Sequence, residues 1–382
     1  MHTLNQDEEA LQFLKEAKRN IESLPVLNQL ASLQMDLEQY ADAIETLDQA
    51  GKFSPVADKA NQNWNAALRC RAAGMLGDLA QAKNCASQLD DEYHRGLADR
   101  LTNKTGASKR VQLSIPFIQQ YRMTCVPATL TMLCRYWKLP ADQVEVADAI
   151  CYDGTPSHKA RRWLETHGLI TREFTLNWDL AVALLDRKIP FAVYTTEATS
   201  AHVQVAMGYD ELRRTFIFRN PSFPQVHEAF AEQFLKHYAA TGPSGMVVVP
   251  AGQENLLAGF NFPDADLYDR LRRIQQALEE HHRSGAGTQF EELRSAAPGH
   301  WLTFTAGRAL FSYDTNTPAL MECLSQLLTL FPTDANLSLA KLGIMRETAR
   351  REERLEFLRQ ICARKEADPV FHQQLAQELT VC

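Results

Sequence analysis

Hydrophobic side chains recur at intervals of three and four residues in the first hundred residues of the chain. Six of them lie on one face of a predicted pair of helices: Leu30, Leu33, Leu37, Tyr40, Ile44 and Leu47. This interval is the period of a helix that buries one face. A stretch that begins at Leu79 resembles the stretch that begins at Tyr40, 39 residues earlier. Residues 1–100 are therefore predicted to form paired helical repeats.

The pattern changes after residues 101–110, a polar stretch without an apolar period that is predicted to be a linker. In residues 111–250, apolar side chains first recur at the helical period and later alternate with polar ones, as they do in strands. The expected elements are an extended run at 111–118, helices at 127–137, 141–150 and 157–167, and strands at 191–194, 203–208, 215–218 and 246–249. Helices followed by strands that tight turns connect are typical of an α+β domain with an antiparallel sheet.

A helical period returns over residues 251–382. Pro298 and Pro332 lie 34 residues apart, which is the period of tetratricopeptide repeats, and each precedes a predicted helix. Both flanking segments, 1–100 and 251–382, thus resemble tetratricopeptide-like repeats. The last helix opens at Pro369 and has no helix after it to pair with, which is unusual in a repeat array. Either the natural chain continues past Cys382, so that this segment is truncated, or the last helix packs elsewhere.

Composition narrows the classes of protein. The net charge is −7, 23% of the residues are charged and 45% are hydrophobic, as in an ordinary globular protein. No basic cluster predicts nucleic-acid binding, and no apolar run reaches the roughly 20 residues that a membrane span needs. The N-terminus is charged and is not a signal peptide. The 8 cysteines form no CxxC pair or other close metal spacing, so we expect a reducing cytoplasm, with buried thiols and one reactive thiol.

Four residues in the middle segment carry candidate chemistry. Gln119 stands six residues before Cys125, His202 opens an apolar strand, and Asn220 precedes a proline. In a papain-type thiol hydrolase the Cys is the nucleophile, the His its base, the Asn orients the His and the Gln binds the oxyanion. Gln120, one residue on, is the competing candidate for the oxyanion role, and on an extended segment it would point the other way.

The expected local structure supports these roles. Thr124 can cap a helix that begins at Cys125, and Pro127 suits the first turn, so the helix dipole would favour the thiolate. A hairpin with its turn at 210–214 would bring Asn220 close to His202. Taken singly, such a cysteine is more often buried, such a histidine packed in a strand, and an Asn-Pro pair a turn.

These motifs resemble those of the papain-like peptidases that remove double-glycine leaders from bacteriocins, which are bacterial enzymes. The resemblance covers residues 111–250 and includes Gln119, the run Cys125-Val126-Pro127-Ala128 before an apolar helix, the strand from His202 to Asp210, and Asn220-Pro221. It implies a papain-like α+β domain without a metal or organic cofactor. The family usually has Gly after the nucleophile, where this chain has Val126, and often Asp where this chain has Asn220.

The resemblance implies a cysteine peptidase that cleaves a peptide or isopeptide bond through an acyl-enzyme on Cys125. The helical repeats would then recruit a protein substrate or partner. Two alternatives stay open: a catalytically silent scaffold with a peptidase-like fold, and transfer of the acyl group to an amine by the same residues. The sequence determines neither the substrate nor the oligomeric state.

Overall fold

The computed structural model describes residues 7–21, 23–53, 58–103, 108–197, 200–348, 350–365 and 367–380. The chain forms two compact units. Unit 1 comprises residues 1–120 and 205–233, and unit 2 comprises residues 121–204 and 234–382. Each unit therefore combines helical-repeat residues with part of the middle segment. Four residues of the predicted linker, 104–107, and the C-terminal Cys382 lie outside the described residues.

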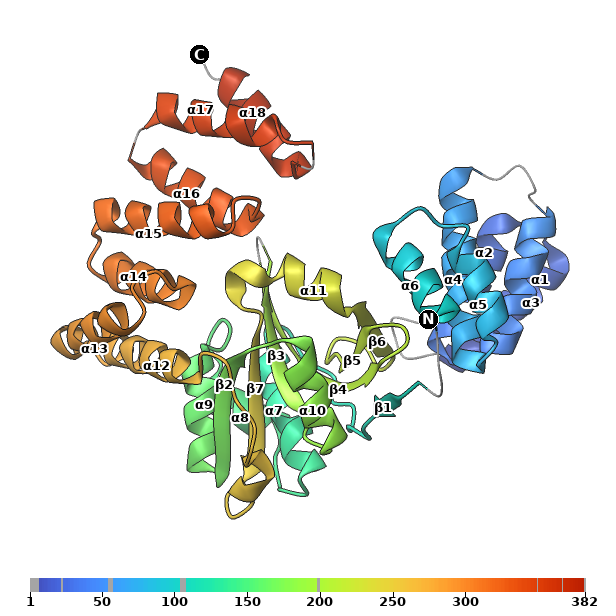
Figure 1. The fold of residues 1–382 in the computed structure, drawn as a ribbon, viewed down its shortest axis with the longest axis horizontal. Coiled ribbons are helices and arrows are strands. Elements are labelled where there is room, and N and C mark those ends of the chain that lie inside the picture. Colours follow the sequence, from blue (N-terminus) through green and yellow to red (C-terminus); the bar gives the residue numbers. More distant parts are fainter. Residues whose placement is uncertain are drawn as a thin grey trace. The chain divides into compact units, whose positions relative to one another are not determined.

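The N-terminal segment of unit 1 is helical, as predicted. Its helices follow one another along the chain (Figure 1): α1 (Asp7–Asn20), α2 (Leu24–Asp36), α3 (Tyr40–Phe53), α4 (Lys59–Leu76), α5 (Leu79–Ala86) and α6 (Glu92–Thr102). The predicted helix pair corresponds to α2 and α3. The two similar stretches each begin a helix, at Tyr40 in α3 and at Leu79 in α5. Asp58, Asp78 and Asp91 cap α4, α5 and α6, because each carboxylate accepts a hydrogen bond from a backbone N–H three residues on.

The described strands form one seven-stranded sheet, in which every pairing with a known register is antiparallel. Its strands are β1 (Arg110–Gln112), β2 (Leu169–Thr175), β3 (Phe191–Thr196), β4 (Ala201–Asp210), β5 (Thr215–Arg219), β6 (Val226–Phe230) and β7 (Ser244–Pro250). Their order is β2-β7-β3-β4-β5-β6, with β1 paired to β4. Unit 2 contains β2, β7, β3 and the start of β4, whereas the rest of β4 belongs to unit 1 with β1, β5 and β6.

The four predicted strands correspond to β3, β4, β5 and β7, so the sequence located the centre of the sheet correctly. The pattern gave no sign of β2 and β6, and of the extended run predicted at 111–118 only residues up to Gln112 are in a strand. Gly208 explains part of the β1 pairing. A Cβ at this position would lie 2.1 Å from the Val111 carbonyl oxygen, so only glycine permits the approach.

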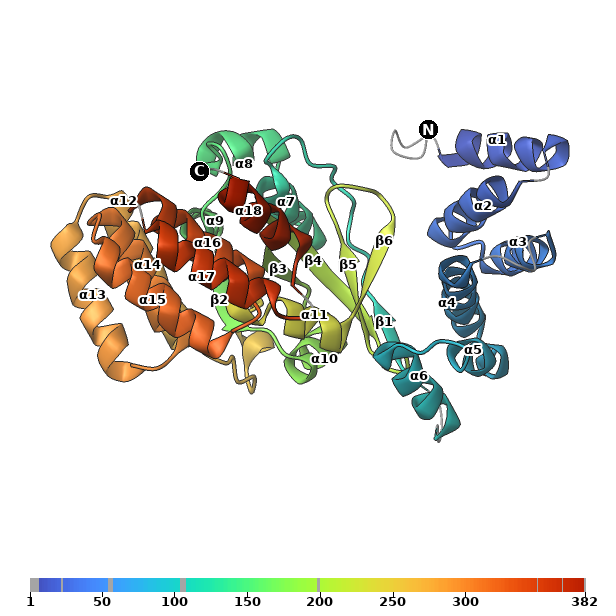
Figure 2. The ribbon, with the colours of Figure 1, turned by 90° about the horizontal axis from the view of Figure 1, so that it is seen from above.

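Unit 2 begins with four helices of the middle segment (Figure 2): α7 (Cys125–Tyr136), α8 (Gln143–Ile150), α9 (Ser157–Thr166) and α10 (Trp178–Asp186). Helix α7 is the most deeply buried, because every residue from Val126 to Cys134 lies in the core. Two hydrogen bonds tie it to the sheet: the Thr129 hydroxyl donates to the Val203 carbonyl at 3.0 Å, and the Trp137 indole donates to the Val248 carbonyl at 2.8 Å. These bonds fix the register of α7 against β4 and β7.

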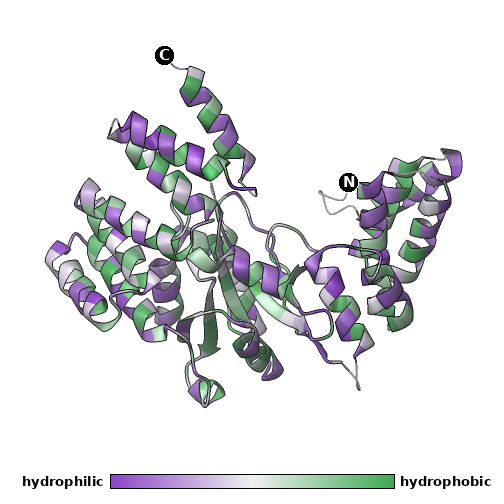
Figure 3. Cartoon of the chain, turned by 45° about the horizontal axis from the view of Figure 1, so that its top comes forward, coloured by the Kyte–Doolittle hydropathy of each residue, from purple (hydrophilic) through white to green (hydrophobic). Residues whose placement is uncertain are grey.

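The C-terminal helices of unit 2 pack pairwise in sequence order. After the short helices α11 (Ala231–His237), η2 (Ala239–Thr241) and η3 (Glu254–Leu257) come α12 (Ala265–Glu279), α13 (Arg283–Ala296), α14 (Trp301–Tyr313), α15 (Thr317–Leu330), α16 (Ala335–Glu347), α17 (Arg351–Cys362) and α18 (Pro369–Thr380). Pro298 and Pro332 lie just before α14 and α16, as the 34-residue period predicts. Figure 3 shows both hydrophilic and hydrophobic residues on each helix, which is typical of helices that bury one face.

The predicted α+β class, with an antiparallel sheet between two helical segments, is confirmed. In the described ranges, every helix falls short of the length and apolarity required to cross a membrane. The domain limits 1–100, 111–250 and 251–382 stay predictions.

Candidate active site

Cys125 is the first residue of α7 in unit 2, as predicted. Its side chain is half-buried. The sulfur lies against three backbone N–H groups, those of Val203, Val126 and Cys125 itself, which stabilise its charged form. Two of these groups belong to the first turn of α7, where N–H groups have no partner within the helix. The nucleophile candidate is therefore directed at a cluster of hydrogen-bond donors.

Burial nevertheless raises the pKa of the Cys125 thiol above its ordinary value. Burial is the largest cause, the three backbone N–H groups act against it, and the neighbouring Cys151 raises the pKa further. The sequence predicted the opposite direction, because the helix N-terminus was expected to favour the thiolate. That expectation left out the desolvation of the sulfur, which a sequence pattern does not reveal. The position of the helix alone does not activate this thiol.

Thr124 occupies the N-cap position of α7, but its hydroxyl does not cap the helix. The hydroxyl accepts a hydrogen bond from the Tyr121 backbone N–H at 2.8 Å and another from the Gln143 side-chain amide at 3.1 Å. The prediction of a side-chain cap was therefore wrong. Thr124 instead closes the turn before Cys125, and Gln143 connects this turn to α8.

His202 is the second residue of β4 and also belongs to unit 2. Its ring is half-buried, and its carbonyl accepts a hydrogen bond from the Thr195 hydroxyl at 3.4 Å. The next residue, Val203, directs its N–H at the Cys125 sulfur and its carbonyl at Thr129 of α7. The Cys125 sulfur thus lies against the backbone of the residue next to His202, and the pairing of the two side chains as nucleophile and base stays a prediction.

The other two candidates belong to unit 1. Gln119 is exposed, whereas Gln120 is half-buried and its backbone N–H donates to the Pro221 carbonyl at 2.8 Å. Asn220 follows directly after β5, and its Oδ1 accepts a hydrogen bond from the Ser222 backbone N–H at 2.8 Å. The Gln119-Gln120 and Asn220-Pro221 segments are therefore neighbours. An amide oxygen has a second lone pair, so the bond to Ser222 leaves Asn220 able to accept from an imidazole.

Three features of this site have no signal in the sequence. The Val203 N–H is a backbone group and has no motif. Cys151 donates a hydrogen bond from its sulfur to the carbonyl of Met123, two residues before Cys125, at 3.4 Å. The Tyr194 hydroxyl, on β3, is buried without a hydrogen-bond partner, and its electrostatic interaction with Cys125 indicates that the two side chains lie near each other. Such contacts join residues far apart in the chain, so only the fold reveals them.

Val126, where the resembling family has glycine, is only 4% exposed. Its side chain is therefore buried in the core and is not exposed beside Cys125.

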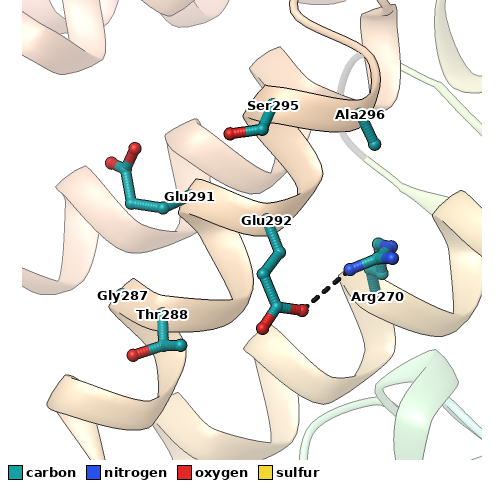
Figure 4. Close-up of a pocket in the computed structure, with 7 residues that line it drawn as sticks. All are labelled: Arg270, Gly287, Thr288, Glu291, Glu292, Ser295 and Ala296. Carbon is teal, nitrogen blue, oxygen red and sulfur yellow. Dashed lines mark hydrogen bonds and ion pairs between the residues drawn. The ribbon is translucent and has the colours of Figure 1, made fainter.

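A hollow of about 770 Å³ lies between α12 and α13 of unit 2 (Figure 4). Its lining includes Arg270 and Glu292, which form an ion pair at 2.8 Å, and small or acidic residues of α13. The lining contains neither cysteine nor histidine, so this hollow offers no thiol chemistry. No group of three or more His, Cys, Asp or Glu side chains that could hold a metal ion occurs among the residues that the structure describes.

Comparison with known families supports the resemblance that the sequence suggested. Residues 112–246 match the Peptidase_C39 like family. The matched segment includes Gln119, Cys125, His202 and Asn220. No curated protein matches the chain significantly.

Three solved structures to which the chain is similar are of two kinds. The peptidase domain of Streptococcus ComA, a bi-functional ABC transporter of a quorum sensing pathway, aligns with 36% of this chain and 98% of its own, at 17% identity and a TM-score of 0.31. A double glycine motif protease from an AMS/PCAT transporter, in complex with a leader peptide, aligns with 37% of this chain and 95% of its own, at 16% identity and a TM-score of 0.30. The tetratricopeptide domain of P58(IPK) aligns with 98% of this chain and 93% of its own, at 11% identity and a TM-score of 0.24.

Proposed function

We propose that this chain is a papain-like cysteine peptidase that hydrolyses a peptide or isopeptide bond through an acyl-enzyme on Cys125. His202 is the general base and acid, Asn220 orients its imidazole, and Gln119 binds the oxyanion together with the backbone N–H of Cys125. The observation that carries the proposal is the position of the sulfur at the start of α7, against the N–H of the residue next to His202.

The reaction follows from the roles of these groups. His202 takes the thiol proton, and the sulfur attacks the carbonyl carbon of the scissile bond. The negative charge that develops on the carbonyl oxygen is stabilised by the N–H of Cys125 and the amide of Gln119. When the tetrahedral intermediate collapses, the imidazolium gives its proton to the leaving amine. Water, deprotonated by His202, then cleaves the thioester and restores the thiol.

The helical segments are proposed to recruit the protein that is cleaved, or a partner protein. A hollow of about 290 Å³ in unit 1 supports this role. Asn61, Asn65 and Arg69 line it at intervals of four residues along α4, with Asn28 of α2 opposite. Amide side chains both donate and accept hydrogen bonds, and can therefore pair with the backbone of an extended peptide.

One observation favours the alternative of a silent scaffold. Because burial raises the pKa of Cys125, the thiol is unreactive at neutral pH unless His202 holds its proton. Thiol reactivity therefore distinguishes the two functions.

The experiment measures the rate at which iodoacetamide modifies each cysteine at pH 7, followed by peptide mapping. Cys151 and Cys362 are half-buried like Cys125 and serve as internal controls. We expect Cys125 to react at least about 100-fold faster than either control, and the His202→Ala variant to lose most of this advantage. Cleavage of a peptide library, followed by mass spectrometry, should disappear in the Cys125→Ala variant.

Equal rates at Cys125, Cys151 and Cys362 would contradict the proposal and favour the scaffold. If Cys125 is fast but the library yields amides with an added amine such as glycinamide, and no hydrolysis, the acyl acceptor is an amine.

A further inference from the structure

The end of β3 lies six residues before His202 and is held from the C-terminal helical segment. The Asn336 side-chain amide, at the second position of α16, donates a hydrogen bond to the Thr196 carbonyl at 3.0 Å. These two residues are 140 positions apart in the chain. The contact lies wholly within unit 2.

Helix α11 and the residue after it hold the same end of β3. Tyr238 donates its hydroxyl to the Glu197 carboxylate, and the His237 ring lies 3.5 Å from the other oxygen of that carboxylate. Burial, and then this hydrogen bond, raise the pKa of Tyr238 to about 12, so the hydroxyl keeps its proton at neutral pH. The Glu197 backbone N–H in turn donates to the Ser200 carbonyl at 2.7 Å, which fixes the approach to β4.

A short path leads from this end of β3 to His202. Thr195, next to Thr196, is only 5% exposed, and its hydroxyl donates to the His202 carbonyl. The backbone that carries the imidazole is thus fixed to β3, and β3 is fixed to α16 through Asn336.

Helix α16 does not depend on Asn336 for its place. Leu324 and Leu327 of α15 and Leu337 of α16 form an apolar cluster with Ala240 of η2. These contacts place α15 and α16 against η2, and the hydrogen bond of Asn336 places the start of α16 at the end of β3. Removing the Asn336 amide should therefore leave the packing of these helices intact.

We propose that Asn336 is a positioning residue for His202, through which the C-terminal repeats set the geometry of the thiol–imidazole pair. The inference rests on the proposed function, because it takes His202 to be the base. A displacement of about 1 Å in a positioned group can lower a rate by about 100-fold, so one lost hydrogen bond at this distance from the ring should cost less.

The test compares Asn336→Asp with wild type. Aspartate has the same shape but cannot donate to Thr196, and it suits the first turn of a helix at least as well as asparagine. A merely structural role of Asn336 therefore predicts no loss. We expect the iodoacetamide rate at Cys125 to fall about tenfold at pH 7, with its pH profile moved toward that of an unpaired thiol. Gln373→Glu, an exposed position on α18, makes the same change of charge and should leave the rate unchanged.

Hydrogen exchange provides a readout that does not depend on activity. We expect faster exchange in β3 and at the start of β4 in Asn336→Asp, and no change in α15 and α16. An unchanged rate at Cys125 together with unchanged exchange in β3 would overturn the inference. If wild-type Cys125 is itself unreactive, the proposed function fails. The exchange at β3 and β4 then decides alone whether Asn336 holds the backbone of His202.

Discussion

A cluster of buried charges connects each helical segment to the middle segment, and the two clusters have opposite compositions. In unit 1, the Glu228 carboxylate of β6 lies among three arginines, which we call the N-terminal junction: Arg213 at 2.7 Å, Arg110 at 3.0 Å and Arg71, from α4, at 3.8 Å. Burial acts to raise the pKa of Glu228, but the arginines outweigh it and hold the pKa below its usual value.

In unit 2 the composition is reversed. Arg161 of α9, only 2% exposed, lies among three carboxylates, which we call the C-terminal junction: Glu165 at 2.9 Å, Asp269 of α12 at 2.6 Å and Glu173 of β2 at 3.9 Å. Burial raises the pKa of Glu173 to about 7, and the attraction of Arg161 and Arg272 only partly offsets it. The three carboxylates at this junction are thus balanced by only two arginines among these residues, Arg161 and Arg272.

The difference gives the junctions opposite responses to pH. Glu228 has a lowered folded pKa, so its stabilisation is present above its unfolded pKa and is lost as the pH falls through the folded value. Glu173 has a raised folded pKa, so its contribution is present below its unfolded pKa and is lost as the pH rises from about 4.5 through about 7. Acid should therefore weaken the N-terminal junction, whereas the C-terminal junction should weaken as the pH rises from about 4.5 to about 7.

The largest effect on stability is expected when the carboxylate of the N-terminal junction is removed. In Glu228→Gln, the buried Arg213 keeps its charge but loses its nearest ion-pair partner. We expect the free energy of unfolding of unit 1 to fall by about 3 to 5 kcal/mol at pH 7. Urea titration followed by hydrogen exchange in α4, α6 and β6 measures this loss separately from unit 2.

Glu232→Gln is the matched control, because its partner Arg214 lies 3.6 Å away and the Glu232 side chain is 70% exposed. It should change the free energy of unfolding by less than about 1 kcal/mol. If Glu228→Gln has as little effect as Glu232→Gln, the ionic junction does not stabilise unit 1.

Neutralising Glu173 should have a smaller effect with the opposite sign. At pH 8 the wild-type carboxylate is ionised against a folded pKa of about 7, whereas its ordinary value is 4.5. Glu173→Gln should therefore raise the free energy of unfolding of unit 2 by up to about 3 kcal/mol at pH 8, and leave it nearly unchanged at pH 4.5. Urea titrations of unit 2 at the two pH values measure both effects. Equal effects at the two pH values would show that Glu173 does not titrate as its burial requires.

The sequence predicted those parts of the fold that local patterns determine. The helices that begin at Tyr40, Leu79 and Cys125 and the four central strands all follow from periodicity and turn residues. The junctions could not be predicted, because Glu228 and Arg161 appear in the sequence as ordinary surface charges. Arg161 is nevertheless among the most deeply buried large side chains. Burial of a charge depends on its distant partners, which no local pattern contains.

For the candidate site, the spacing of Gln119 and Cys125 and the strand predicted to begin at His202 suggested the residues, and their roles stay predictions. The electrostatics were not predictable, because the desolvation of Cys125 and the N–H of Val203 depend on how α7 packs against β4. The hydrogen bond from Asn336 to Thr196 likewise depends on the tertiary structure, because the two residues are 140 positions apart in the chain.

A third prediction concerns an apolar contact between α6 and β6, beside the N-terminal junction. The Tyr93 ring of α6 stacks on Phe230 of β6, with centroids 3.5 Å apart and an angle of 19° between the rings. A double-mutant cycle of Tyr93→Leu and Phe230→Leu should give a coupling energy of about 1 kcal/mol in the free energy of unfolding of unit 1. A coupling energy of zero would mean that α6 does not rest on β6. Because the Tyr93 pKa is raised to about 12 and phenylalanine does not titrate, the coupling should be the same at pH 5 and pH 8. The effect of Glu173→Gln should differ between these same two pH values, so the pair of measurements separates the titrating part of the junctions from the part that packing alone provides.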